Sequence, residues 1–239
     1  MNFPKEVVNV INVLATPLEV FEDIKNNPRL RVPAIVALVC SITVGWFMIE
    51  PSVQPLRIIY ERSFDSESAS AAISSMMKIF FVLRIVLTTV SIYIRWVLFS
   101  LLLMAMIRVY MGVTLLGFKE TISLVAYCEI IFIAMSVLTV LIIYAIGVEK
   151  IERSTDLQIF KGLDYFMSSE NRNAEVAAFL SNLNIFSVWY VLVISSGIRL
   201  LTGLKKLESL AVTGVAWLCW STMAMLEPWI TNSVIKMIS

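Results

Sequence analysis

Four polar residues recur at helical spacing inside one long apolar block, and a fifth polar residue lies inside the next. Arg84, Thr88, Ser91 and Arg95 are spaced by four, three and four residues. Residues at this spacing lie on one face of a helix. Glu129 is the fifth residue. Ionisable groups inside a membrane commonly mark ion or proton paths. The pattern therefore predicts a polar stripe that either lines such a path or holds helices together.

Arg95 and Glu129 are expected to lie at similar depth in the membrane. Arg95 is about 13 residues before Arg108, where its helix ends. Glu129 is about 10 residues after Lys119 on the antiparallel helix that follows, and each residue adds about 1.5 Å. A charge at mid-membrane costs at least about 2.5–3.5 kcal/mol, which favours pairing. We predict an Arg95–Glu129 contact, which either takes part in transport or, more simply, fixes the helix register.

The chain carries no recognisable catalytic, metal-binding or cofactor-binding motif. It has no histidine, which removes the usual metal ligands and the Ser-His and Cys-His pairs. Walker-type phosphate loops, GxSxG and clustered acidic motifs are also absent from the sequence. Three cysteines lie inside apolar blocks without metal-ligand or redox spacing, at Cys40, Cys128 and Cys219. We therefore expect a protein that is not an enzyme and needs no cofactor or metal.

The composition is that of an integral membrane protein. Of the 239 residues, 59% are hydrophobic and 15% are charged, whereas an ordinary soluble domain is about 45–50% apolar and about 25% charged. The mean hydropathy is +0.84. A net charge of +1 gives no support to nucleic-acid binding.

The apolar residues form five blocks, each long enough for a transmembrane helix of about 20 residues. Only helices satisfy their own backbone in lipid, so the predicted fold is an all-α polytopic bundle of five transmembrane helices. The predicted spans are 32–49, 79–107, 121–147, 185–202 and 207–226, and the first is expected to end at Glu50-Pro51. We expect one transmembrane domain over residues 32–239, with long outer loops at 50–78 and 148–184. Val176, Phe179, Leu180 and Leu183 have helical spacing within the second loop.

An amphipathic segment over residues 1–31 precedes the first span. Its second helix is predicted to start at Thr16-Pro17 and to end at Asn26-Asn27-Pro28. Amphipathic helices of this kind commonly lie in the lipid headgroup region. The alternative is that they pack on the end of the protein's own bundle.

Lysine and arginine residues set the predicted orientation. The two sides of a five-span layout carry equal numbers of these residues. Those on the N-terminal side lie in shorter segments close to span ends, where the positive-inside rule is counted. We expect a cytoplasmic N-terminus and an outer C-terminus.

Three parts of the chain carry a resemblance to a known family. They are Pro17-Leu18-Glu19-Val20-Phe21 with Asn27-Pro28-Arg29; Gly117, Phe118, Lys119 and Glu120 with Ala126-Tyr127; and Leu183-Asn184-Ile185-Phe186-Ser187-Val188-Trp189 with Gly197. On these residues and its five-span layout, the chain resembles the bacterial branch of the Yip domain family, named from eukaryotic Rab-GTPase-interacting proteins. The family often has a proline shortly after the tyrosine. This sequence lacks it, so a kinked third span does not follow from the resemblance.

The resemblance implies a non-enzymatic membrane adaptor or accessory subunit in a bacterial inner (plasma) membrane. Bacterial members of the family include accessory subunits beside ABC-type exporters, so the expected partners are the lipid bilayer and another integral membrane protein, for example an ABC transporter. A homo-oligomer is the other expected assembly. The competing hypothesis is a small oligomeric transporter or channel that uses the Arg95–Glu129 region. Few intramembrane charges and the absence of an obvious inverted repeat favour the adaptor.

Overall fold

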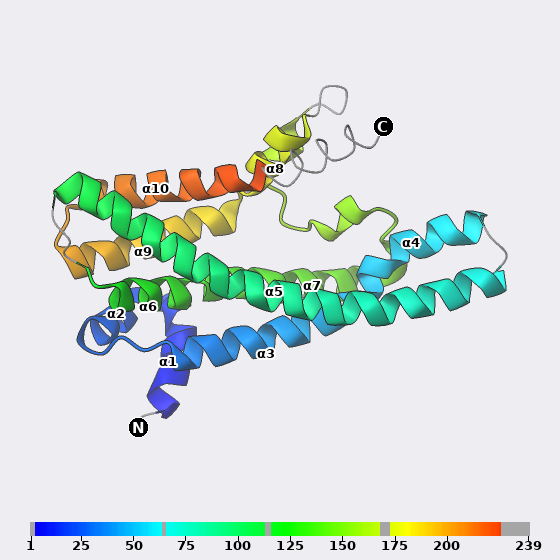
Figure 1. Cartoon of the computed structure of the whole chain (residues 1–239), viewed down its shortest axis with the longest axis horizontal. Helices are drawn as coiled ribbons and strands as arrows, with labels where there is room; N and C mark the ends of the chain where they lie inside the picture. The colour runs from blue at the N-terminus through cyan, green and yellow to red at the C-terminus, as the bar shows by residue number, and fades with distance from the viewer. Residues whose placement is uncertain (1–2, 64–65, 113–115, 168–172, 226–239) are drawn as a thin grey trace. The chain divides into compact units, whose positions relative to one another are not determined.

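The chain folds into helices (Figure 1). The computed structural model describes all residues except 1–2, 64–65, 113–115, 168–172 and 226–239. Within this described part there are ten α-helices, four short 3₁₀ helices and no strand. The predicted all-α fold class is therefore confirmed, as expected where each segment must satisfy its own backbone hydrogen bonds in lipid.

The helices follow one another with short connections except between α7 and α8. The α-helices are α1 (Phe3–Ala15), α2 (Pro17–Asn26), α3 (Arg31–Phe47), α4 (Ile49–Ser63), α5 (Ser66–Met111), α6 (Phe118–Cys128), α7 (Ile130–Ile146), α8 (Ala174–Ser181), α9 (Ile185–Thr202) and α10 (Lys206–Thr222). The 3₁₀ helices are η1 (Val148–Lys150), η2 (Ser154–Leu157), η3 (Leu163–Phe166) and η4 (Met223–Met225).

Three described helical segments are long and apolar enough to cross a membrane. They are Ile85–Met111, Phe118–Ile146 and Ile185–Thr202. The pair Arg31–Phe47 and Ile49–Ile59, which meet at 40°, makes a fourth if it forms one bent span. The protein is thus a multi-span helical membrane protein.

The predicted count of five spans stays a prediction. Helix α10 falls in the fifth predicted block, and its 17 residues make it shorter than the three long segments. The block ends at residue 226, where the described part of the chain stops.

Residues 50–78 differ from the loop that we expected. Helix α4 covers the first part and α5 begins at Ser66, so the described residues of this segment are helical. We expected Pro51 to end the preceding helix. It lies instead in the first turn of α4, where a missing N–H group costs no intrahelical hydrogen bond.

The described residues of 148–184 are largely irregular before α8 begins. They contain η1, η2 and η3 before α8. The predicted helical spacing at Val176, Phe179 and Leu180 is confirmed, because all three residues lie in α8. Leu183 lies beyond its end. The side chain of Asn173 caps α8 by accepting from the backbone N–H groups of residues 175 and 176.

The chain divides into two compact units. The first comprises residues 1–32, 96–131 and 161–239, and the second comprises residues 33–95 and 132–160. The second unit has its own apolar core around Met48, Val140, Ile143 and Ile151. Residues 1–32 share a unit with α6 and α9, and the predicted boundary between residues 1–31 and 32–239 stays a prediction.

Within the first unit, α1 and α2 pack on the helical bundle. Helix α2 contacts α6 and α9, and α1 contacts α2 and α6. The buried face of α2 consists of Val20, Phe21 and Ile24. These contacts favour packing on the bundle, the alternative that the sequence left open for the amphipathic segment.

Candidate functional site

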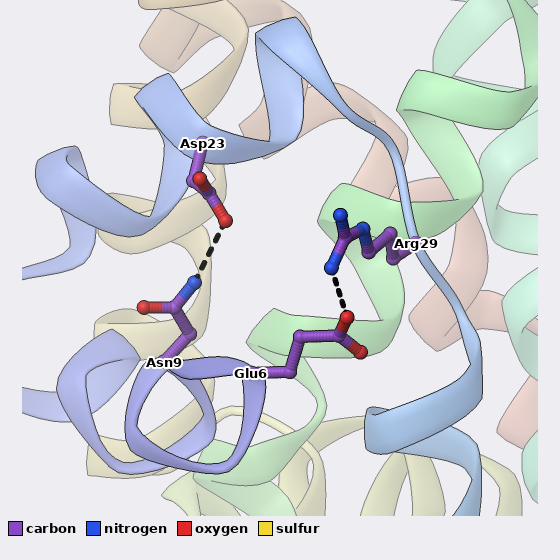
Figure 2. A network of polar contacts seen from close by, with 4 residues as sticks. All are labelled: Glu6, Asn9, Asp23 and Arg29. Carbon is purple, nitrogen blue, oxygen red and sulfur yellow. Dashed lines mark hydrogen bonds and ion pairs between the residues drawn. The ribbon is translucent and has the colours of Figure 1, made fainter. Parts of the chain in front are cut away.

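Polar side chains join α1 to α2 and to the segment that leads into α3 (Figure 2). Glu6 and Asn9 are three residues apart on α1, which places them on one face. Asn9 Nδ2 donates a hydrogen bond of 3.0 Å to Asp23 Oδ2 on α2. Arg29, just beyond α2, donates from Nη1 to Glu6 Oε1 and forms an ion pair with it. We call these four residues the N-terminal polar cluster.

The turn after α2 holds Arg29 in place. Asn27 caps the helix, and its backbone N–H donates to the carbonyl of Asp23 at 2.9 Å. With its amide oxygen turned towards the guanidinium, Asn27 also accepts from Arg29 Nε at 3.1 Å. The guanidinium is therefore bonded on two sides, by Glu6 and by Asn27.

The N-terminal polar cluster lies near Tyr127 of α6. Tyr127 is 2% exposed. The charges of Glu6, Asp23 and Arg29 are close enough to act on its hydroxyl group. Glu6 and Asn9 are each 7% exposed, so the cluster is itself largely shielded from solvent. Charge-assisted hydrogen bonds are stronger in such surroundings than in water.

An apolar contact lies on the other side of α2. A Cβ atom added at Gly197 of α9 would lie 2.4 Å from Leu124 Cδ1 and 3.1 Å from Phe21 Cδ2. Both distances are too short for an undisturbed contact. Glycine at this position therefore lets α2, α6 and α9 approach closely, as small residues commonly do in membrane bundles.

Each of the three segments that carry the family resemblance contributes residues to one of these three helices. Phe21 comes from the first segment, Tyr127 from the second and Gly197 from the third, and their helices α2, α6 and α9 contact one another pairwise. Local roles account for other residues of these segments. Asn184 caps α9 by accepting from the N–H groups of Phe186 and Ser187.

Sequence reasoning missed the N-terminal polar cluster as a site. Asn27-Pro28-Arg29 was noted only as part of the resemblance, and Glu6 and Asn9 were overlooked because they stand outside the apolar blocks. The signal available was their spacing of three residues on a helix that is otherwise apolar on the same face, where Val10 and Val13 are buried.

The predicted polar stripe lies on a single helix, as expected. Arg84, Thr88, Ser91 and Arg95 are all in α5. The side chain of Arg84 lies outside what the structure describes. Thr88 and Ser91 are exposed, and Ser91 Oγ donates to the carbonyl of Thr88 at 2.9 Å. Local backbone bonding of this kind satisfies a hydroxyl group that faces lipid.

Arg95 and Glu129 each have a defined place. The Arg95 guanidinium carbon lies 5.3 Å from the ring centroid of Phe132 on α7, within the range of a cation–π contact. Glu129 is fully buried at the junction of α6 and α7. Its backbone remains helical (φ −58°, ψ −22°) and its N–H donates to the carbonyl of Val125 at 2.9 Å. The pairing of Arg95 with Glu129 stays a prediction.

The N-terminal polar cluster has a structural role, because its bonds hold α1 against α2 and the segment that follows α2. Its two carboxylates are engaged by Asn9 and Arg29. Over the residues that the structure describes, no group of three or more histidine, cysteine, aspartate or glutamate side chains is placed to hold a metal ion. None of Cys40, Cys128 and Cys219 forms a disulfide.

Comparison with known proteins yields one match. The family model described as the Yip1 domain matches residues 11–226 of the chain. No curated protein and no solved structure matches it. The matched range contains Phe21, Leu124 and Gly197, the residues at which α2, α6 and α9 approach one another.

Proposed function

We propose that this protein, which belongs to the Yip1 domain family, is a non-enzymatic membrane adaptor or accessory subunit that binds another integral membrane protein. The proposal rests on one observation: helices α1 and α2 pack on the bundle as a folded cap, and apolar side chains on the outer face of this cap are exposed. One face of α1 is buried, with Glu6, Asn9, Val10 and Val13. The side chains of Val7, Val8 and Ile11 remain exposed.

The exposed side of α1 suits a protein partner. Ile11 is 65% exposed and Val8 51% exposed, and together with Val7 and Leu18 they form an apolar surface that a partner would cover. The N-terminal polar cluster fixes the orientation of this surface before binding. A preorganised surface loses less conformational entropy on association. The resemblance makes a membrane subunit of an ABC-type exporter the first partner to test.

Site-specific photo-crosslinking tests the proposal. A photoreactive amino acid at Ile11, on the exposed side of α1, should give a protein adduct in membranes of the native host. The matched control is Lys25, which is exposed on α2 outside the apolar surface. A protein adduct at position 11 and none at position 25 supports the adaptor. Adducts with lipid alone at position 11 would assign this surface to the headgroup region and count against a partner there.

One observation favours the transporter or channel as a second candidate. Glu129 is fully buried within the candidate span Phe118–Ile146, and acidic residues inside spans often serve transport. In this alternative the protein is a homo-oligomer that uses the Arg95–Glu129 region. Purified protein in liposomes that moves an ion or a solute, and loses this activity with Glu129→Gln, would support the second candidate over the first.

The proposed setting is a bacterial inner membrane, with five spans and a cytoplasmic N-terminus. This orientation places the α1–α2 cap in the cytoplasm. The local density of lysine and arginine near span ends supports it.

A further inference from the structure

Helix η3 exposes two aromatic side chains and one leucine side chain among the residues that the structure describes. Phe166 is 81% exposed, Tyr165 is 63% exposed and Leu163 is 48% exposed. The rings of Tyr165 and Phe166 contact each other in an edge-to-face arrangement, with centroids 5.6 Å apart. Exposed apolar surface of this kind, gathered within four residues, marks a contact with something outside the chain.

The position of η3 is fixed relative to α9. The backbone N–H of Leu163 donates to the carbonyl of Leu183 at 3.2 Å. A Cβ added at Gly162 would lie 2.4 Å from the carbonyl oxygen of Leu180 and 2.6 Å from that of Ser181. Only glycine permits this close approach to the end of α8. The exposed aromatic side chains are therefore fastened to the residues immediately before α9.

Helix α9 indicates what lies at that level. It is the candidate span Ile185–Thr202, and if α9 crosses the membrane, its first turn lies at the bilayer surface. Leu183, which bonds η3, stands two residues before Ile185. Ile185 and Val188 in the first turn of α9 are also exposed. The residues of η3 would then lie at the membrane–water interface.

The charges of the segment match a phospholipid surface. Lys161 Nζ lies 4.8 Å from the ring centroid of Tyr165, and both side chains are exposed. Asp164, the acidic residue of η3, is buried and 5% exposed. The surface therefore presents a cation and aromatic rings without an exposed carboxylate from η3. Aromatic residues with a neighbouring lysine are typical of the membrane–water boundary, where the lysine reaches the headgroups.

We propose that residues 161–166 are an interfacial anchor that inserts Tyr165 and Phe166 into the headgroup region of the bilayer beside the first turn of α9. Lys161 binds lipid phosphate in this arrangement. The anchor goes beyond the adaptor role and depends only on α9 crossing the membrane. Its occupant is the lipid surface itself, so it acts whether or not a protein partner is bound.

Spin labelling of the full chain in vesicles tests the anchor. The vesicles contain phosphatidylethanolamine and phosphatidylglycerol. Cys40 and Cys219 are replaced by alanine, and buried Cys128 is kept. A nitroxide is attached at Phe166→Cys, with Leu192→Cys, exposed on α9 inside the span, as the lipid reference. Ala174→Cys, exposed at the start of α8, is the reference outside the span.

Collision with oxygen and with a water-soluble nickel chelate gives the depth of each label. At position 166 we expect an oxygen-to-nickel ratio between those of positions 174 and 192, and the same order for a label at Tyr165→Cys. Lys161→Gln should shift the label at position 166 towards the aqueous value. A ratio at positions 165 and 166 equal to that at 174 would overturn the proposal. Labels that neither reagent reaches would also overturn it, because protein would then cover the segment.

Discussion

The guanidinium of Arg29 donates to the carboxylate of Glu6, 23 residues earlier in the chain. This bond ties the start of α1 to the segment between α2 and α3, and the Asn9–Asp23 hydrogen bond ties α1 to α2. Helix α1 has 13 residues, and isolated helices of that length are marginal in water. The polar bonds and the buried faces together hold α1 on the bundle.

Removing Arg29 should therefore loosen the cap. We expect Arg29→Ala to lower the free energy of unfolding by about 1–3 kcal/mol, because Glu6 keeps its charge in a shielded position without its cation. The measurement is thermal unfolding in detergent, followed by the reaction of buried Cys128 with a thiol dye. Glu6→Gln should cost less, since the amide can still accept a hydrogen bond from Arg29.

A surface ion pair provides the control. Arg57 Nη1 lies 3.2 Å from Glu50 Oε1 on α4, and their side chains are 36% and 44% exposed. Exposed pairs contribute about 0–1 kcal/mol, so Arg57→Ala should leave the unfolding temperature nearly unchanged. Equal effects of Arg57→Ala and Arg29→Ala would contradict a special role for the N-terminal polar cluster.

Gly197 should tolerate no side chain. An added methyl group would press on Leu124 and Phe21, and overpacking of this kind typically costs about 1–3 kcal/mol. We expect Gly197→Ala to lower the unfolding temperature in the same assay. Leu124→Ala on the Gly197→Ala background should restore part of the loss, because the nearest clashing atom belongs to Leu124.

Gly214 is the matched control for this substitution. It also lies in a helix, α10, but an added Cβ would meet no atom within 4 Å. Glycine inside a helix costs roughly 0.5–1 kcal/mol relative to alanine, so Gly214→Ala should be neutral or stabilising. A loss of stability at Gly214 as large as at Gly197 would show that the assay reports something other than the α2–α6–α9 contact.

The sequence predicted the elements whose signals are local. Long apolar blocks gave the three long candidate spans, and Thr16-Pro17 correctly predicted the start of α2. The likeness to the Yip domain family is confirmed by the match over residues 11–226. Hydropathy and helix-start signals each depend on a few neighbouring residues, so one sequence suffices to detect them.

Other features depend on contacts between distant residues. The Glu6–Arg29 bond depends on how α1 packs against α2, which no local pattern specifies. Pro51 was interpreted as a helix end, yet proline is equally compatible with the first turn of a new helix, and the structure places it there. The role of the polar stripe stays a prediction, because the Ser91 hydroxyl bonds to its own helix and this local bond is compatible with a position facing lipid or protein.

Labelling of introduced cysteines should establish the topology. With five spans and a cytoplasmic N-terminus, cysteines within residues 57–75 and 149–171 should react with an impermeant maleimide on intact cells. A cysteine at Lys206, exposed at the start of α10, should react only after the membrane is opened. The opposite pattern would reverse the orientation. Labelling of the two segments from different sides would contradict the number of spans.

The last prediction concerns Arg95 and Glu129. Arg95 packs over Phe132, three residues after Glu129 in the sequence, and Glu129 is fully buried. If the two are paired, removing either partner leaves a charge in a medium of low dielectric constant. For buried pairs this typically costs about 3–5 kcal/mol. Arg95→Leu and Glu129→Leu should therefore each lower the yield of folded protein and its thermal stability.

The double variant separates a structural role from a functional one. Replacing both residues with leucine removes the desolvation cost together with the attraction, so stability should recover much of the loss. A double variant that folds but loses partner binding or transport would give the pair a functional role beyond helix register. Single variants that both unfold at the wild-type temperature would show that Arg95 and Glu129 are not paired. The counter-charge of Glu129 would then come from Arg84 or from a partner subunit. The thermal stability of a variant that combines Arg84→Leu with Glu129→Leu distinguishes these two sources.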